Sequence, residues 1–238
     1  MDRLITTAEP DVTDRRTPPV LLPPALRSTL GPAAVLAALV VLLLGVLYGD
    51  RGGPGTVDER IAAALDDLRP PWRTLALAVD FLGEPAGAAA LIVAAVAGCL
   101  LLRRPRAAVF VVLGTGVPVV ATTLLKHVVG RTINGGHLSY PSGHTAFLTA
   151  LALVAGVLAA GRLGLGRAAG ALLVLTGALL AGGAMGWAQV ALDAHYPTDT
   201  VGGWCTALAA VPALARLTDR AADRRAARTA GTGRPAQP

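Results

Sequence analysis

Long uncharged, apolar runs alternate with short polar segments along the chain. Six runs without a charged residue cover residues 28–49, 85–102, 107–125, 145–161, 168–192 and 200–215. A helix of about 20 apolar residues crosses the hydrocarbon core of a bilayer, and four of the six runs reach or approach that length. The fourth and sixth runs are shorter, so we expect their helices to begin in the loops before them. The pattern predicts an all-α fold, an integral membrane six-helix bundle.

The composition supports a membrane protein over a soluble one. The chain is 53% hydrophobic and 15% charged, with a mean hydropathy of +0.58, whereas soluble domains carry about 25% charged residues. Six such runs could not all be buried inside a soluble chain of 238 residues. We expect the lipid bilayer as a partner and no nucleic acid, and the oligomeric state stays open. Cys99 and Cys205 both fall in predicted spans, so no disulfide framework is expected.

Polar segments flank the predicted membrane domain, which covers residues 28–215. Residues 1–27 are proline-rich and lack an apolar core near the start, which indicates a disordered tail rather than a cleaved signal peptide. Residues 216–238 carry six arginines and two aspartates. They predict a second flexible tail, which either sets the topology or lies on anionic lipid.

The distribution of basic residues predicts the orientation. With six spans, the two tails share one side with the second and fourth loops, and that side holds 15 lysines and arginines against 6 on the other. Because Lys and Arg accumulate on the cytoplasmic side, both termini are predicted to be cytoplasmic. The third loop, about residues 126–144, and the fifth, about 193–199, then face outward together.

These two outward loops hold the candidate chemistry. They contain the only lysine, Lys126, and all four histidines of the chain, which are His127, His137, His144 and His195. His195 and Asp199 lie four residues apart, a spacing that places two side chains on one face of a helix. A carboxylate beside an imidazole fixes its tautomer and stabilises its charged form. Asp199 could also cap the last span, and the two roles are compatible.

The sequence PSGH, residues 141–144, directly precedes the fourth apolar run. The start of a helix offers free backbone N–H groups to phosphate, and glycine lets the backbone approach a ligand closely. Ser142 and Gly143 therefore indicate an anion site, beside which His144 would donate a proton. The alternative is that Ser142 is an ordinary N-cap with no ligand.

Taken together, Lys126, the PSGH sequence and His195-x3-Asp199 resemble the type 2 phosphatidic acid phosphatase superfamily. The three motifs of that family are K-x6-R-P, P-S-G-H and S-R-x5-H-x3-D, and the resemblance covers about residues 57–215. It implies that His195 attacks phosphorus, that Asp199 orients His195, and that His144 protonates the leaving oxygen. It also implies a phosphohistidine intermediate, with no metal and no cofactor.

Two arginines of the family motifs are missing. Ile133 and Asn134 stand in place of Arg-Pro in the first motif. Ala188 and Gln189 stand in place of Ser-Arg in the third, and Gln189 offers only neutral hydrogen bonds, worth about 1 kcal/mol against roughly 1.5–3 for charged ones. Arg131, two residues before the motif position, is the candidate replacement. The predicted substrate-binding residues are Lys126, Arg131, Ser142, Gly143 and Gln189.

We therefore expect a phosphatase of lipid phosphate or diphosphate monoesters, isoprenoid or glycerolipid, in the cell membrane with its site on the extracytoplasmic face. The alternative is a non-catalytic or weakly active family member that binds an anionic lipid headgroup, which the missing arginines suggest. Residues 57–82 mix apolar and charged side chains. This segment is expected either to lie in the membrane interface or to form a re-entrant or extracellular cap helix.

Overall fold

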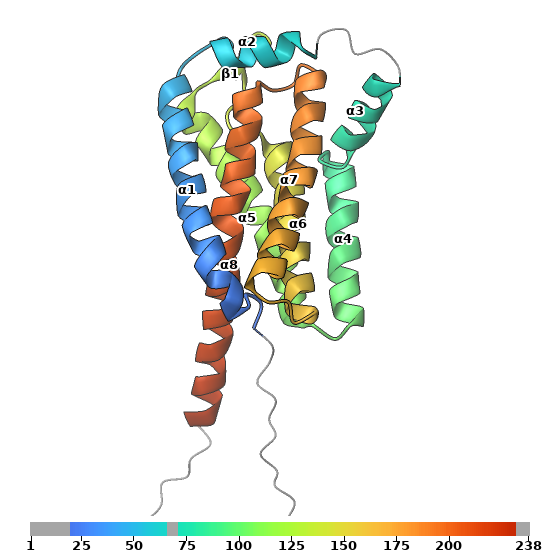
Figure 1. Cartoon of the computed structure of the whole chain (residues 1–238), viewed down its shortest axis with the longest axis vertical. Helices are drawn as coiled ribbons and strands as arrows, with labels where there is room; N and C mark the ends of the chain where they lie inside the picture. Colours follow the sequence, from blue (N-terminus) through green and yellow to red (C-terminus); the bar gives the residue numbers. More distant parts are fainter. Residues whose placement is uncertain (1–19, 66–70, 232–238) are drawn as a thin grey trace, which may run out of the picture.

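The computed structural model describes residues 20–65 and 71–231, and this part of the chain is almost entirely helical (Figure 1). Its helices are α1 (Pro24–Tyr48), α2 (Thr56–Ala63), α3 (Trp72–Phe81), α4 (Pro85–Leu101), α5 (Pro105–Val129), α6 (Gly143–Arg162), α7 (Arg167–Ala191) and α8 (Pro197–Gly231). One short antiparallel ribbon pairs β1 (Thr132–Ile133) with β2 (His137–Leu138). The prediction of an all-α fold is confirmed.

Each predicted apolar run falls on one of the long helices. By length and composition, α1, α5, α6, α7 and α8 can each cross a membrane, and α3 with α4 makes a sixth span bent by 58°. Proline begins α4 and α5, where the missing N–H group costs no helical hydrogen bond. The two short runs are extended as expected, because α6 begins at Gly143 and α8 at Pro197. The predicted six-span membrane bundle is therefore confirmed.

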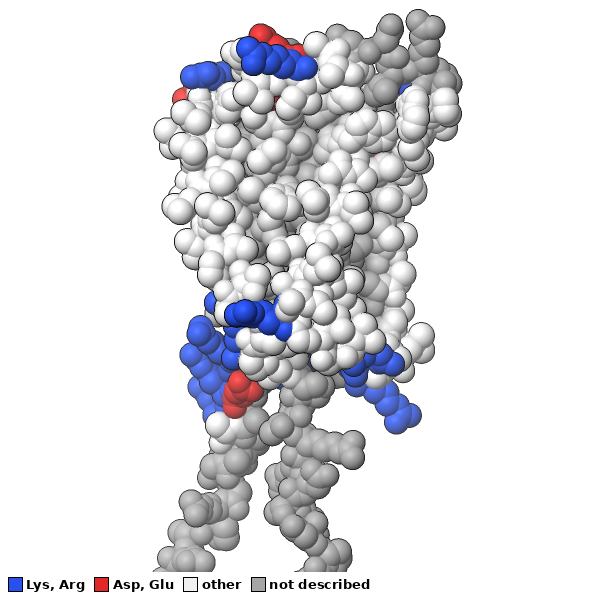
Figure 2. Space-filling model, in the orientation of Figure 1, with Lys and Arg blue, Asp and Glu red and all other residues white. Residues whose placement is uncertain are grey.

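Helix α6 lies at the centre of the bundle and packs against α5, α7 and α8. Its buried Leu153, Val154 and Val157 join Phe110 of α5 and Val174 of α7 in one apolar core. Exposed leucine and valine side chains cover the outward faces of the long helices. Figure 2 shows charged side chains at both ends of the visible face and an uncharged zone between them, as a bilayer requires.

Helical structure extends into both predicted tails. Helix α1 begins at Pro24, and the backbone N–H groups of Leu21 and Leu22 donate to the Asp219 carboxylate at 2.8 and 3.1 Å. Arg106 pairs with the same carboxylate at 2.5 Å. These contacts hold Asp219 against the start of α1 and of α5. Residues 216–231 continue α8 as a helix, where the sequence predicted a flexible tail. Residues 1–19 and 232–238 lie outside the described residues.

The segment 57–82 is divided into two helices, with residues 66–70 outside the described part. Helix α2 lies across the end of the bundle where α1, α5 and α7 finish and α6 and α8 begin (Figure 1). It packs against α8. Helix α3 leads into α4 through the bend and packs against α7. The bend and the position of α2 bring both halves of this segment toward the two loops with the candidate chemistry.

The predicted orientation can be tested with a matched pair of cysteines in a background without Cys99 and Cys205. Gly53 lies at the end with α2, whereas Gly166 precedes α7 at the opposite end, and a Cβ at either position would meet nothing within 4 Å. We expect Gly53→Cys to react with a membrane-impermeant thiol reagent in intact cells. Gly166→Cys should react only after lysis. The reverse pattern of labelling would place the loops with the candidate chemistry in the cytoplasm.

Candidate active site

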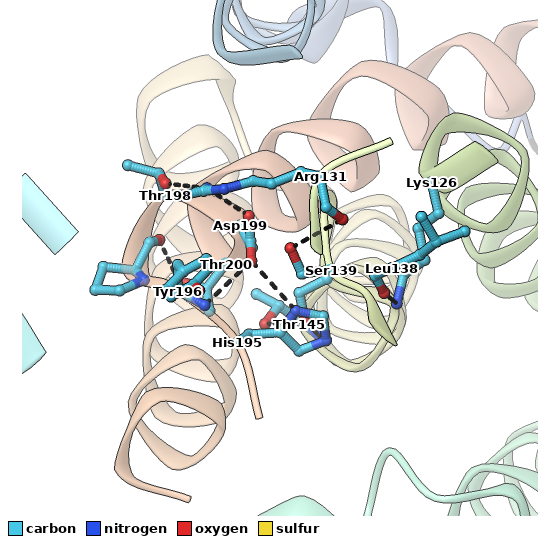
Figure 3. A network of polar contacts seen from close by, with 12 residues as sticks. Lys126, Arg131, Leu138, Ser139, Thr145, His195, Tyr196, Thr198, Asp199 and Thr200 are labelled. Atoms are coloured by element: carbon cyan, nitrogen blue, oxygen red, sulfur yellow. Dashed lines mark hydrogen bonds and ion pairs between the residues drawn. The ribbon is translucent and has the colours of Figure 1, made fainter. Parts of the chain in front are cut away.

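The candidate site lies at the end of the bundle below α2, where the loops after α5 and α7 meet (Figure 3). Nδ1 of His195 lies 3.6 Å from Oδ2 of Asp199, at the distance of an ion pair. The same oxygen accepts a hydrogen bond from the Tyr196 N–H at 3.1 Å. Asp199 is fully buried, and His195 is 8% exposed. The expected pairing is thus present, although His195 lies in the loop before α8 rather than on a shared helical face.

Arg131 lies behind Asp199 and not at the mouth of the site. Its Nη1 donates to Asp199 Oδ1 at 2.7 Å and to Thr198 Oγ1 at 2.6 Å. The guanidinium carbon lies 4.3 Å from the ring centroid of Tyr48 and 4.4 Å from that of Tyr196, so the group sits between two aromatic side chains. The whole residue is buried. The predicted phosphate contact of Arg131 is therefore corrected, because its charge is committed to buried carboxylates.

Asp58 of α2 is the second carboxylate on Arg131, and sequence reasoning missed it. Its Oδ2 accepts from Arg131 Nη2 at 2.7 Å, and its Oδ1 accepts from the Thr198 N–H at 2.9 Å. Burial would raise the pKa of Asp58, but hydrogen bonds from Gly55, Thr198 and Arg131 outweigh it and hold the pKa below 3.8. The sequence marks Asp58 only as an acidic residue in the first turn of a helix.

The PSGH sequence starts α6, as predicted. Ser142 is the N-cap, and its Oγ accepts from the backbone N–H of Thr145 at 3.4 Å. The Ser142 N–H donates to the backbone oxygen of Asp199 at 2.9 Å, which ties the start of α6 to the start of α8. A Cβ at Gly203 would overlap the carbonyl oxygen of Ser142. Close packing of α8 against this loop thus requires glycine at position 203.

His144 faces two carboxylates at the bend between α3 and α4. Its Nε2 lies 3.8 Å from Asp80 Oδ1 and 3.6 Å from Glu84 Oε1. Gln189 is buried and donates its side-chain N–H to the same oxygen of Asp80. The ligand atoms of Asp80, Glu84 and His144 all lie within 4.8 Å of one another, so these residues could hold a metal ion. Sequence reasoning singled out neither carboxylate.

Lys126 lies near the end of α5, and its Nζ donates to the backbone oxygen of Leu138 at 3.2 Å. Burial lowers the pKa of His195 below 6.5, and the charges of Lys126 and His144 lower it further, although Asp199 acts in the opposite direction. The net effect favours the neutral imidazole, which is the form that can act as a nucleophile or base. His127 and His137 are exposed.

The sequence model of the PAP2 superfamily matches residues 107–223, a range that contains Lys126, the PSGH sequence and the His195–Asp199 pair. The chain belongs to the PAP2 superfamily. Three PAP2 motif positions that are intact in the sequence, His144, His195 and Asp199, thus lie at the same end of the bundle in the structure.

The PAP2 fold is also found in a solved structure. The chain is similar to a crystal structure described as the first transmembrane PAP2 type phosphatidylglycerolphosphate phosphatase from Bacillus subtilis. The two share a TM-score of 0.62 and 22% sequence identity over 81% of this chain and 96% of that chain. No curated protein matches the chain. The family match and the shared fold support a multi-pass membrane protein with a lipid phosphatase function.

The packing of α8 against the PSGH loop predicts opposite effects for two Gly→Ala substitutions. Gly203→Ala should lower the unfolding temperature in detergent, because overpacking a tight contact costs about 1–3 kcal/mol. Gly183→Ala in α7 is the control, since a Cβ there would meet nothing within 4 Å. Gly183→Ala should leave the unfolding temperature unchanged or raise it, because alanine favours a helix by about 1 kcal/mol. An equal shift in both variants would contradict the close contact.

Proposed function

We propose that this PAP2 protein is a membrane phosphatase that hydrolyses lipid phosphate or diphosphate monoesters through a phosphohistidine intermediate. The observation that carries the proposal is the His195–Asp199 pair beside the helix start that bears His144. A carboxylate on Nδ1 leaves Nε2 of the imidazole as the nucleophile and stabilises the positive charge that develops on the ring. No step of this reaction requires a metal ion.

The reaction proceeds in two displacements at phosphorus. His195 Nε2 attacks the terminal phosphorus, the bond to the lipid oxygen breaks, and protonated His144 gives its proton to that oxygen. The lipid alcohol, or the lipid monophosphate when the substrate is a diphosphate, then leaves. Neutral His144 next accepts a proton from water while the water oxygen attacks the phosphohistidine. The N–P bond breaks, inorganic phosphate leaves, and His144 is protonated for the next cycle.

Phosphate binding relies on few positive charges. Ser142 N–H and Thr145 N–H are already used within the protein, so the N–H groups of Gly143 and His144 at the start of α6 are the donors for phosphate. Lys126 supplies the fixed positive charge. Gln189 acts mainly through Asp80, which it contacts directly. Arg131 stabilises Asp199 and makes no phosphate contact.

The position of the site fits a substrate that is anchored in the bilayer. We propose that both termini are cytoplasmic and that the site faces the extracytoplasmic side. The smaller share of basic residues at the end of the bundle with α2 supports this orientation. Isoprenoid and glycerolipid phosphates both present their phosphate at that surface. The second candidate function is binding of an anionic headgroup without turnover. The neutral Gln189 and the buried Arg131 favour it, since neither offers a free charge to the transition state.

Release of inorganic phosphate from a panel of isoprenoid and glycerolipid phosphates, in detergent with EDTA, separates the two functions. His195→Ala should abolish release, and His144→Ala should lower it by about 10²–10⁴-fold, the usual contribution of a general acid. His137→Ala is the control, because His137 lies exposed on β2. Activity of the His195 variant equal to wild type would refute the mechanism. Headgroup binding without any release by the wild type would favour the second function.

The pH dependence follows from the lowered pKa of His195. A lower pKa keeps the nucleophile neutral in more acidic solution, so the acidic limb of kcat/KM should lie below pH 6.5. Asp199→Asn removes the group that raises this pKa, so the limb should move to still lower pH while kcat falls. A soluble short-chain substrate allows both profiles to be measured. An acidic limb well above pH 6.5 would contradict the assignment of His195 as a neutral nucleophile.

A further inference from the structure

We propose that Asp58 is a positioning residue of the active site, which acts from α2 through Arg131 and Thr198 to hold Asp199 behind His195. The proposal rests on the function proposed above. Asp58 lies in a helix outside the matched range 107–223, so it is a contribution of this chain beyond the family motifs.

The carboxylate of Asp58 makes several polar contacts at once. The side chain is fully buried, and it accepts hydrogen bonds from Gly55 N–H at 3.0 Å, Thr198 N–H at 2.9 Å and Thr198 Oγ1 at 3.1 Å. It also pairs with Arg131 at 2.7 Å. The N–H groups in the first turn of a helix have no partner within that helix. Asp58 of α2 therefore caps the start of α8 by accepting from the N–H of Thr198, the residue before Asp199.

The same contacts form a chain of alternating charge. Arg131 lies between Asp58 and Asp199, with both ion pairs at 2.7 Å and all three side chains fully buried. Figure 3 shows Asp199 between Arg131 and His195, so the arginine lies on the side of Asp199 away from the imidazole. The negative charge of Asp58 partly compensates the positive charge of Arg131. The electrostatic potential that Asp199 and Arg131 together produce at His195 is therefore more negative.

The groups that face His195 fix the direction of the expected change. Burial lowers the pKa of His195 most, and the charges of Lys126 of α5 and His144 of α6 lower it further, whereas Asp199 of α8 raises it. Loss of the Asp58 charge leaves Arg131 paired with Asp199 alone. The field at the imidazole then becomes more positive, which disfavours the charged ring and lowers the pKa of His195 further.

The test compares Asp58→Asn with Glu59→Gln, which removes the same charge from the next, exposed residue of α2. Asp58→Asn should lower kcat about 10- to 100-fold, because a misplacement of about 1 Å costs about 10²-fold. KM on a short-chain phosphate should change less than about twofold, since Asp58 does not contact the substrate. The acidic limb of the pH profile should shift to lower pH. Glu59→Gln should match wild type in all three measurements.

A second measurement does not depend on turnover. NMR titration of ¹⁵N-labelled histidines in detergent, with the His195 signal assigned from its absence in His195→Ala, reports the pKa directly. The His195 titration should move to lower pH in Asp58→Asn and stay in place in Glu59→Gln. If the wild type releases no phosphate from any lipid, the proposed function fails, and the titration still decides the role of Asp58.

Thr198→Val is the second variant, for use if Asp58→Asn does not fold. Folding is judged by the elution profile in size-exclusion chromatography. This variant removes the hydroxyl that bonds both Asp58 and Arg131, but keeps the side-chain shape and the backbone N–H. It should lower kcat in the same direction by about 10-fold, the cost of losing a hydrogen bond to a charged group. The proposal is overturned if the folded Asp58 variant matches Glu59→Gln in kcat and titration. Without a folded Asp58 variant, a Thr198→Val kcat equal to wild type overturns it.

Discussion

A guanidinium can be buried in a protein only where carboxylates or other acceptors compensate its charge, and Arg131 imposes that requirement on this bundle. Its two ion pairs bring α2, the segment after α5 and the start of α8 to one point. Asp199 in turn positions two other parts of the site, since its side chain faces His195 and its backbone oxygen accepts a hydrogen bond from the Ser142 N–H. The loops that carry the PAP2 motifs are thus joined through one buried charge.

The spans were predictable because hydropathy is a local property of the sequence. Each apolar run appears as a long helix, and the proline and PSGH signals mark the starts of α4, α5 and α6. The tails were predicted poorly for the opposite reason. Asp219 anchors Leu21 and Leu22 from 198 and 197 residues away, and polar composition alone cannot indicate a partner at that separation. An Arg-rich helix continuing from a membrane span also has the composition of a flexible tail.

The residues of the candidate site also fall into those that the sequence indicates and those that depend on distant contacts. His195, Asp199 and His144 could be proposed from the sequence, because the spacing of their motifs is a local property of the chain. The roles of Arg131 and Gln189 were inferred from their places relative to the family motifs. Both buried side chains proved to have carboxylate partners, the buried Asp199 and the half-buried Asp80. Position along the chain does not determine which way a loop side chain points. Arg131 comes directly after Gly130, whose left-handed conformation redirects the backbone at the end of α5.

The loss of two family arginines therefore changes the electrostatics of the site more than its framework. Arg131 holds a positive charge inside the framework. The surface toward a phosphate carries Lys126 and, beside His144, the carboxylates of Asp80 and Glu84. Carboxylates at this place weaken the attraction of the site for a dianion. For the proposed phosphatase, we expect less binding energy from the phosphate group. We then expect specificity to depend more on the apolar part of the lipid, which is anchored in the membrane beside the end of the bundle.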